Sequence, residues 1–497
     1  MLETADLTKK VTKEEYKKLA PTLGERLAAL QQPLRQAKLP VVILFEGWGA
    51  AGKGGLVGKL IENFDPRGFF VSSFIAPTEL ERREPVLWRY WKAIPKQGQI
   101  AIFDRSWYLD VTTARIEEKL DDKTVEKRLR DISTFERQLT DGGTLILKFF
   151  IHIDKKEQKK RFEKLQQDKD TAWRVTDLDW QRNRRYEEYR RAFDEALQET
   201  NTANAPWCVI SGMDRRAAAL DVFAAVVDGI DGALARKAAA APEESCAETK
   251  IQPGPFHLLS MPKLAEIPLN RRLNERDYQS RLKEQQDLLS ELHERMYRKK
   301  VPAVIAYEGW DAAGKGGNIR RVAKALDPRG YRVIPIAVPT PEELAHHYLW
   351  RFWTNLPRTG HIAVFDRTWY GRVLVERVEG LCKEDDWRRA YREINEFEHA
   401  LCDWGAVVIK FWLQIDKDEQ LRRFSTRQNT PSKQWKITDE DWRNRSKWDQ
   451  YEICVNEMLR YTSTDFAPWH IVESQDKKYG RVQTLKIITD ALRNCLK

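Results

Sequence analysis

Nine residues in the second half of the chain have the composition and spacing of a phosphate-binding loop. They run from Gly309 to Gly317 as Gly-Trp-Asp-Ala-Ala-Gly-Lys-Gly-Gly, after an apolar stretch at 302–306 and before a basic segment with helical periodicity. Glycine lets the backbone approach a phosphate without a clashing Cβ, a helix N-terminus favours an anion, and Lys315 supplies a mobile cation. A strand, Gly-x-x-x-x-Gly-Lys and a helix in this order predict a phosphate site. Its expected glycines are Gly309, Gly314, Gly316 and Gly317.

A divalent metal ion beside this loop would need oxygen ligands, and two aspartates are candidates. Gly316 stands where such loops usually carry a Ser or Thr hydroxyl for Mg²⁺, so another residue must hold the metal. Asp311 lies inside the loop, and Asp366 ends a second apolar run at 361–366. Mg²⁺ in such sites takes one or two carboxylates together with phosphate oxygens. We therefore expect Asp311 and Asp366 to be metal ligands.

Basic residues follow the second apolar run directly. The chain continues as Asp366-Arg367-Thr368-Trp369-Tyr370-Gly371-Arg372. Arginines at the end of a buried strand bind phosphate oxygens through paired N–H groups, so Arg367 and Arg372 are candidates for catalysis with Asp366. A surface ion pair is the alternative for Asp366 and Arg367. For Trp369 and Tyr370 the sequence favours packing in the core.

A further basic cluster follows the apolar run at 406–413. Two interpretations remain open for it: a solvated helical face, or a mobile lid that brings cations to phosphate and excludes water as a competing acceptor. Its cations are Arg422, Arg423, Arg427, Lys433 and Lys436.

The whole unit occurs twice in the sequence. Gly47 and Gly309 lie 262 residues apart, and the same offset relates Asp104 to Asp366 and continues without net insertion from about 16/278 to 214/476. A glycine-rich turn with a solvated lysine would explain one copy of the loop, but the second copy argues against that alternative. We expect domains at 1–230 and 265–497, joined by a linker at 231–264 that contains an alanine run and Pro253-Gly254-Pro255.

Short apolar runs alternate with amphipathic segments of helical period in each half, which is typical of a parallel sheet covered by helices. The fold class is therefore α/β. Ligands bind such sheets beyond the carboxyl ends of the strands, where both candidate loops lie. Expected strands are 303–307, 332–338, 361–366, 406–413 and 469–472, with counterparts at 41–45, 70–76, 99–104, 144–151 and 207–210.

Composition limits the remaining classes of protein. No apolar run reaches the length of a membrane span and the N-terminus lacks the features of a signal peptide, so we expect a cytoplasmic protein without a membrane partner. Lysine and arginine exceed aspartate and glutamate by 10, which fits a polyanion ligand or a solubilising surface. Most of the 18 tryptophans recur in both halves, which favours packing over stacking on nucleic acid.

At these motifs the chain resembles the family-2 polyphosphate kinases. The shared pattern comprises the loop at 309–317, Asp-Pro-Arg-Gly at 327–330, Pro339-Thr340 and Phe-Asp-Arg-Thr-Trp-Tyr-x-Arg at 365–372. Trp-Lys-Ile-Thr at 435–438 and Trp-Asp-x-Tyr at 448–451 also match. The resemblance covers nearly all of each half and implies two tandem P-loop kinase-like α/β/α sandwich domains, each with a mostly parallel five-stranded sheet and a helical lid.

The resemblance also implies an activity, a cofactor and partners. Tandem members of this family look like the subclass that uses Mg²⁺ and inorganic polyphosphate to convert AMP to ADP, with no nucleic acid involved. We expect either a homo-oligomer or a pseudo-dimeric monomer. Catalytic roles fall to Asp311, Lys315, Asp366, Arg367 and Arg372; phosphate or nucleotide binding to the loop glycines, Thr340, Arg351 and Glu376; and polyphosphate binding in the lid to Arg423, Arg427, Lys433 and Lys436.

Differences between the halves predict a division of labour. The first half has Gly49 for Asp311 and Asp110 for Arg372, and it also lacks the counterparts of Glu376, Arg427 and Lys433. We therefore expect the second domain to catalyse and the first to be structural or to help bind the polyanion. Two alternatives stay open for the whole chain: an ATP-dependent nucleotide kinase on the same fold, and a nucleic-acid-binding protein with relic phosphate loops.

Overall fold

The computed structural model describes residues 1–239 and 251–497, and the chain divides into two compact units. Unit 1 contains Met1–Thr78, Arg89–Cys246 and Pro341–His347, and unit 2 contains Glu79–Trp88, Ala247–Thr340 and Tyr348–Lys497. Part of the expected linker, 240–250, lies outside the described residues.

Unit 1 is built on a sheet of five parallel strands. They are β1 (Val41–Gly47), β2 (Phe69–Ser73), β3 (Ile100–Asp104), β4 (Leu145–His152) and β5 (Trp207–Ser211). Their order is β2-β3-β1-β4-β5, so β1 lies at the centre. The side chains from Val41 to Phe45 are all fully buried, because helices cover both faces of the sheet.

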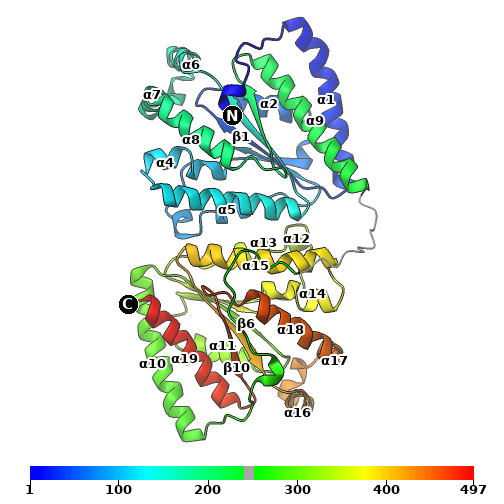
Figure 1. The fold of residues 1–497 in the computed structure, drawn as a ribbon, viewed down its shortest axis with the longest axis vertical. Coiled ribbons are helices and arrows are strands. Elements are labelled where there is room, and N and C mark those ends of the chain that lie inside the picture. Colours follow the sequence, from blue (N-terminus) through cyan, green and yellow to red (C-terminus); the bar gives the residue numbers. More distant parts are fainter. Residues whose placement is uncertain (240–250) are drawn as a thin grey trace. The chain divides into compact units, whose positions relative to one another are not determined.

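The helices of the first half form the two outer layers of this unit (Figure 1). One face carries α1 (Lys13–Gln36), α2 (Lys53–Ile61) and α9 (Arg215–Ala239), and the other carries α4 (Thr113–Glu117), α5 (Asp122–Asp141) and α8 (Tyr186–Glu199). The remaining α-helices are α3 (Trp88–Trp91), α6 (Lys155–Gln167) and α7 (Asp177–Arg184). The 3₁₀ helices of the first half are η1 (Leu2–Thr4), η2 (Pro66–Gly68), η4 (Trp107–Asp110), η5 (Ala172–Arg174) and η3 (Glu81–Arg83), of which η3 belongs to unit 2.

Unit 2 repeats this sheet. Its parallel strands are β6 (Ala303–Gly309), β7 (Tyr331–Pro335), β8 (Ile362–Asp366), β9 (Val407–Gln414) and β10 (Trp469–Glu473). Their order is β10-β9-β6-β8-β7, which again places the strand before the glycine-rich loop at the centre. The carboxyl ends of β6 and β8 are adjacent, because Tyr307 pairs in register with Asp366.

Helices cover both faces of the unit 2 sheet as well (Figure 1). One face carries α10 (Glu275–Lys299), α11 (Lys315–Ala323) and α19 (Lys477–Cys495), and the other carries α14 (Val375–Val378), α15 (Glu384–Asp403) and α18 (Trp448–Thr462). The other α-helices of the second half are α13 (Trp350–Trp353), α16 (Lys417–Gln428), α17 (Asp439–Ser446) and α12 (Pro341–Leu344), of which α12 belongs to unit 1. The 3₁₀ helices are η6 (Leu264–Glu266), η7 (Trp369–Arg372) and η8 (Pro431–Lys436).

The predicted fold class is confirmed: both halves form parallel five-stranded sheets between helices. Two strands end three residues earlier than predicted. The runs at 70–76 and 332–338 stop pairing at Ser73 and Pro335, because their neighbours β3 and β8 end opposite those residues. Each is an edge strand with no second partner, so the ladder ends with the neighbour.

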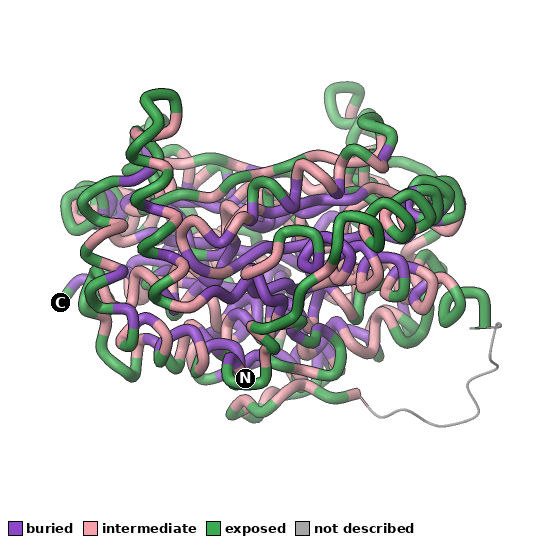
Figure 2. Tube along the Cα trace, turned by 90° about the horizontal axis from the view of Figure 1, so that it is seen from above, coloured by how far each residue is buried: buried purple, intermediate pink, exposed green. Residues whose placement is uncertain are grey.

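Buried and exposed residues separate along these layers. In Figure 2 the buried trace runs through the interior, and exposed residues lie along the outer helices and loops. No helix in the described ranges is both long and apolar enough to cross a membrane.

Candidate active site

The loop after β6 has the backbone conformation of a phosphate cradle. Gly309 has φ +150°, and a Cβ at this position would lie 2.8 Å from the Leu413 carbonyl oxygen, so only glycine fits. Ala312 has φ 62° and Gly314, which directly precedes α11, has φ +116°. L-residues other than glycine rarely adopt positive φ, and Ala312 does so at a cost of about 1 kcal/mol. Gly316 faces open space, which leaves room for a ligand against the backbone.

Arg423 on α16 braces this loop from below. Its side chain is 3% exposed and donates to the carbonyl oxygens of Ala312 at 3.0 Å, Ala313 at 2.9 Å and Ser474 at 2.6 Å. Its carboxylate partner is Glu419. We predicted Arg423 as a lid cation for polyphosphate, but its N–H groups are occupied by main-chain oxygens. Its contacts support the shape of the loop.

The loop, the end of β8 and the helices α17 and α18 line a cavity of about 80 Å³. The predicted residues that meet there are Gly309, Asp311, Lys315 and Arg367. The lysine ammonium folds back onto the Gly309 carbonyl at 2.7 Å, within the loop that it would leave to reach a phosphate. Sequence reasoning missed other lining residues, namely Glu308, Gln420, Glu440, Asn444 and Tyr451.

Asn444 is the most informative of the missed residues. Its amide N–H donates to Asp311 Oδ2 at 3.0 Å, and Tyr451 donates to the amide oxygen of Asn444 at 3.4 Å. This contact orients the Asp311 carboxylate, whose other oxygen lies 3.7 Å from the Arg367 guanidinium. A difference between the two halves could have pointed to this residue, because the position equivalent to Asn444 in the first half is Arg182.

Glu308 is a second missed acid, and it lies just before the loop. It is buried and accepts a hydrogen bond from the Thr368 hydroxyl at 2.7 Å. Burial raises the pKa of Glu308, while the nearby Lys315 ammonium opposes that shift. This contact ties the loop after β8 to the end of β6.

The acidic residues suit a metal ion that arrives with its phosphate ligand. Asp311 follows β6 and Asp366 ends β8 opposite Tyr307, so both lie at the same edge of the sheet, although only Asp311 is among the residues that line the cavity. Among the residues that the structure describes, no three His, Cys, Asp or Glu side chains form a ready-made metal cage. Two carboxylates without a cage match the way proteins hold Mg²⁺ together with substrate phosphates.

Other predicted residues form a second cluster beside this cavity. Arg372 pairs with Glu376 at 2.9 Å, and its guanidinium lies 4.5 Å from the centre of the Tyr348 ring. Burial raises the pKa of Glu376, while Arg372 and Arg351 favour its charged form. Thr340 is exposed and is not among the residues that line the cavity described above.

The predicted lid cations lie on α16 and η8. Arg427 donates to the Lys436 carbonyl oxygen at 3.0 Å, which joins the two elements. Lys433 and Lys436 are exposed, and the Lys436 ammonium lies 5.0 Å from the ring centre of Trp435. The side chains of Lys433 and Lys436 therefore lie in solvent, where they can attract an anion.

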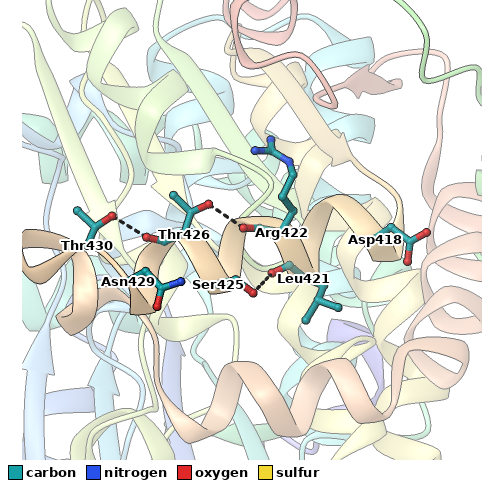
Figure 3. Close-up of a pocket in the computed structure, with 7 residues that line it drawn as sticks. All are labelled: Asp418, Leu421, Arg422, Ser425, Thr426, Asn429 and Thr430. Carbon is teal, nitrogen blue, oxygen red and sulfur yellow. Dashed lines mark hydrogen bonds between the residues drawn. The ribbon is translucent and has the colours of Figure 1, made fainter.

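A hollow of about 640 Å³ along α16 is not part of this site (Figure 3). Its hydroxyl groups are satisfied within the helix: Ser425 donates to the Leu421 carbonyl, Thr426 to that of Arg422 and Thr430 to that of Thr426. Arg422 is paired with Glu419 at 2.6 Å. The three hydroxyl groups and Arg422 therefore already have partners within the helix.

A buried ion pair supports the loop after β8. Lys410 and Glu398 are both fully buried and lie 2.7 Å apart, and Glu398 accepts hydrogen bonds from Trp369 at 3.0 Å and Tyr370 at 2.7 Å. The packing role predicted for Trp369 and Tyr370 is confirmed, since both are fully buried. Unit 1 has the same arrangement, with Lys148 and Glu136 at 2.7 Å.

A central strand, a glycine-rich loop, a helix that begins with lysine, and acids and arginines at the same sheet edge define a phosphotransferase of the phosphate-loop class. The comparisons agree with that class. The family model described as polyphosphate kinase 2 (PPK2) matches residues 10–238 and 272–497. The chain therefore belongs to the polyphosphate kinase 2 family, which confirms the predicted resemblance.

Full-length relatives share the tandem arrangement. A protein of Pseudomonas aeruginosa named "Polyphosphate:AMP phosphotransferase" is 41% identical over 498 residues, covering 100% of this chain and 99% of the relative. One of the same name from Pseudomonas syringae pv. tomato is 42% identical over 495 residues, covering 99% and 98%. A crystal structure from Pseudomonas aeruginosa PA01, titled as a polyphosphate kinase 2, has a TM-score of 0.87 and 40% identity over 100% of this chain and 99% of that chain.

Proposed function

We propose that this chain transfers the terminal phosphate of inorganic polyphosphate to AMP and releases ADP. The name of its full-length relatives supports this substrate pair. The observation that carries the proposal is the unit 2 cavity, where Lys315, Arg367 and Asp311 meet beside a loop shaped for phosphate.

The transfer is an in-line displacement. An oxygen of the AMP phosphate attacks the terminal phosphorus of the chain, the bond to the bridging oxygen breaks, and polyphosphate leaves one unit shorter. Charge spreads over the three equatorial oxygens in a loose transition state, so fixed cations and N–H groups supply most of the catalysis. We assign that role to Lys315, Arg367, Arg372 and the loop amides. The attacking oxygen is already anionic, so no protein base is needed.

Asp311 and Asp366 are the residues that would hold Mg²⁺. When bound, the ion would neutralise phosphate charge and polarise the transferred group. Asn444 fixes one oxygen of Asp311, which keeps the carboxylate in place before the substrate arrives. We assign Glu376, Arg351 and Thr340 to the nucleotide, and the lid cations Arg427, Lys433 and Lys436 to the polyphosphate donor.

We further propose that the C-terminal domain, 265–497, carries the catalytic site and that the N-terminal domain, 1–230, does not turn over substrate. The first domain has Gly49 in place of the metal-binding Asp311 and Asp110 in place of Arg372. A carboxylate at position 110 would repel the phosphate that Arg372 attracts. We expect the reaction to take place in the cytoplasm. The protein would be either a pseudo-dimeric monomer or a homo-oligomer, and light scattering distinguishes the two by their mass.

The test is a donor and acceptor screen with the full chain. Purified protein with Mg²⁺ is given polyphosphate or ATP as donor and each nucleoside monophosphate or diphosphate as acceptor, and products are resolved by chromatography. We expect ADP from polyphosphate and AMP. ADP formed only from ATP would favour the nucleotide-kinase alternative, and salt-sensitive nucleic-acid binding without phosphate transfer would favour the binding-protein alternative.

A further inference from the structure

Unit 1 retains the strained backbone of the phosphate loop although it lacks Asp311. Ala50 has φ 59° where Ala312 has 62°, and Arg105 has φ 64° where Arg367 also has 64°. Arg161 donates to the carbonyl oxygens of Ala50 at 3.2 Å and Ala51 at 3.0 Å, as Arg423 does in unit 2. Neither alanine nor arginine favours positive φ, so unit 1 maintains a costly loop shape.

Packing does not account for three of the glycines of this loop. A Cβ at Gly52, Gly54 or Gly55 would have no atom within 4 Å. The space beyond them is a cavity of about 990 Å³ that includes Lys53 and Arg105. Seven lysines and arginines line this cavity against three aspartates. An open, glycine-lined and basic hollow is suited to an anion that contacts the backbone.

The contact between Asn444 and Asp311 in unit 2 has no counterpart in unit 1, where a single cation stands in its place. Gly49 stands for Asp311 and Arg182 stands for Asn444, each at the offset of 262 residues. Arg182 lines an adjoining cavity together with Gly49 and Arg105. This cavity has two cations and two acids, whereas its unit 2 counterpart has two cations and three acids.

The Arg182 guanidinium is held in place at that position. It lies 2.7 Å from Glu117 on α4 and 4.0 Å from Asp179 on α7, and its side chain is 21% exposed. A guanidinium can donate paired N–H groups to phosphate oxygens without a metal ion. Among the acids of the larger cavity, Asp104 retains a buried Oδ1 without a hydrogen-bond partner in the described structure. A metal ion at Asp104 is therefore an alternative that a binding test must exclude.

We propose that unit 1 holds a metal-independent binding site for a linear condensed phosphate, in which the Arg182 guanidinium replaces the metal ion and the Asp311 carboxylate of unit 2. The site binds the chain and does not transfer phosphate. This inference shares its ligand class with the proposed function, but it rests on binding within unit 1, so each can fail without the other.

The test measures binding to the full-length chain with excess EDTA. In a Lys315→Ala/Lys433→Ala background, which weakens the unit 2 site, sodium tripolyphosphate, long-chain polyphosphate and orthophosphate are titrated by calorimetry. We expect both condensed phosphates to bind more tightly than orthophosphate. Arg182→Asn, which installs the unit 2 residue, should weaken their binding about tenfold or more. Arg184→Asn, at an exposed arginine two residues away, should change it less than about twofold.

Two further variants separate binding from folding. Arg182→Lys keeps the charge, so its loss of affinity should be smaller than that of Arg182→Asn. Glu117→Gln removes the competing carboxylate and should keep or raise the affinity, whereas a site lost through misfolding would be lost in this variant too. Loss of binding in EDTA, equal affinity for orthophosphate, or equal binding by Arg182→Asn and Arg184→Asn would each overturn the proposal. ADP formation by the unmodified chain reports separately on the proposed function.

Discussion

Asp366 and Asp104 occupy equivalent positions in the two halves, so their substitution can show which unit carries the chemistry. Asp366 ends β8 and Asp104 ends β3, and both follow buried strands of the same pattern. Asp366 has a second carboxylate, Asp311, within the phosphate loop itself, whereas the loop of the first half carries Gly49 at that position. We therefore expect Asp366→Asn or Asp311→Asn to lower kcat for ADP formation about 10²-fold or more, since misplaced charge stabilisation has costs of this size.

Asp104→Asn is the matched control for that prediction. It removes the same charge from the same place in the other sheet, and kcat should stay within about twofold of the unmodified value. Comparable loss of kcat in Asp104→Asn and Asp366→Asn, measured with saturating AMP and polyphosphate, would contradict the division of labour between the domains.

Lys53 gives a prediction about stability and pH. Its ammonium donates to the carbonyl oxygens of Gly47 at 2.9 Å and Trp48 at 3.0 Å, and burial, reinforced by Arg105, lowers its pKa to about 8. An unfolded lysine titrates near 10.4, so between these values the unfolded chain binds more protons than the folded one. The Lys53 contribution to stability should therefore rise with pH from about 8 to 10.4.

The comparison with Lys53→Met isolates that contribution. Below pH 8 the unmodified protein bears the cost of a buried charge that the methionine variant avoids. The free energy of unfolding of Lys53→Met minus that of the unmodified protein should therefore be ~1–3 kcal/mol more favourable to the variant below pH 8 than above pH 10.4. Urea unfolding of both proteins at pH 7.5 and 10.5 measures the difference. A free-energy difference that does not change with pH would contradict the lowered pKa.

At the scale of elements, the positions of the strands followed from the sequence and the shape of the site did not. Apolar runs located the ten strands of the described residues, most clearly the central strands β1 and β6, because a strand buried on both faces must be apolar along its length. The edge strands were predicted too long, since their ends depend on where a neighbour stops pairing. Asn444 and the brace formed by Arg423 were missed, because each depends on contacts between segments more than 100 residues apart.

Each phosphate loop is supported by one arginine, Arg423 in unit 2 and Arg161 in unit 1, and the two can be tested as a matched pair. Arg423→Met should lower kcat/KM for AMP at least tenfold, because the carbonyl oxygens of Ala312 and Ala313 would lose their donors and the loop its shape. Arg161→Met removes the same contacts from unit 1 and should leave kcat/KM within about twofold. If both variants lost activity equally, the unit 1 loop would have a role in turnover.

At the scale of the whole molecule, the two buried ion pairs are a structural feature that both units share. Lys148 with Glu136 and Lys410 with Glu398 have the same kinds of partners and the same 2.7 Å separation, whereas two of the residues that we assign to catalysis, Asp311 and Arg372, are replaced in unit 1. Both ion pairs are fully buried and line none of the cavities described above, so we assign them to the shared fold. The lysine of each pair also donates to the carbonyl oxygen of Thr200 or Thr462, so it joins the sheet to the end of α8 or α18.

Breaking either pair should destabilise its own unit, but only one should affect activity. Lys410→Met and Lys148→Met each leave a buried carboxylate without its cation, a change that costs about 3–5 kcal/mol. The urea concentration at which ADP formation is lost should fall in Lys410→Met and stay near the unmodified value in Lys148→Met, while circular dichroism reports a destabilised transition in both. An equal fall in both activity midpoints would mean that catalysis requires an intact unit 1, which would revise the assignment of the reaction to the C-terminal domain alone.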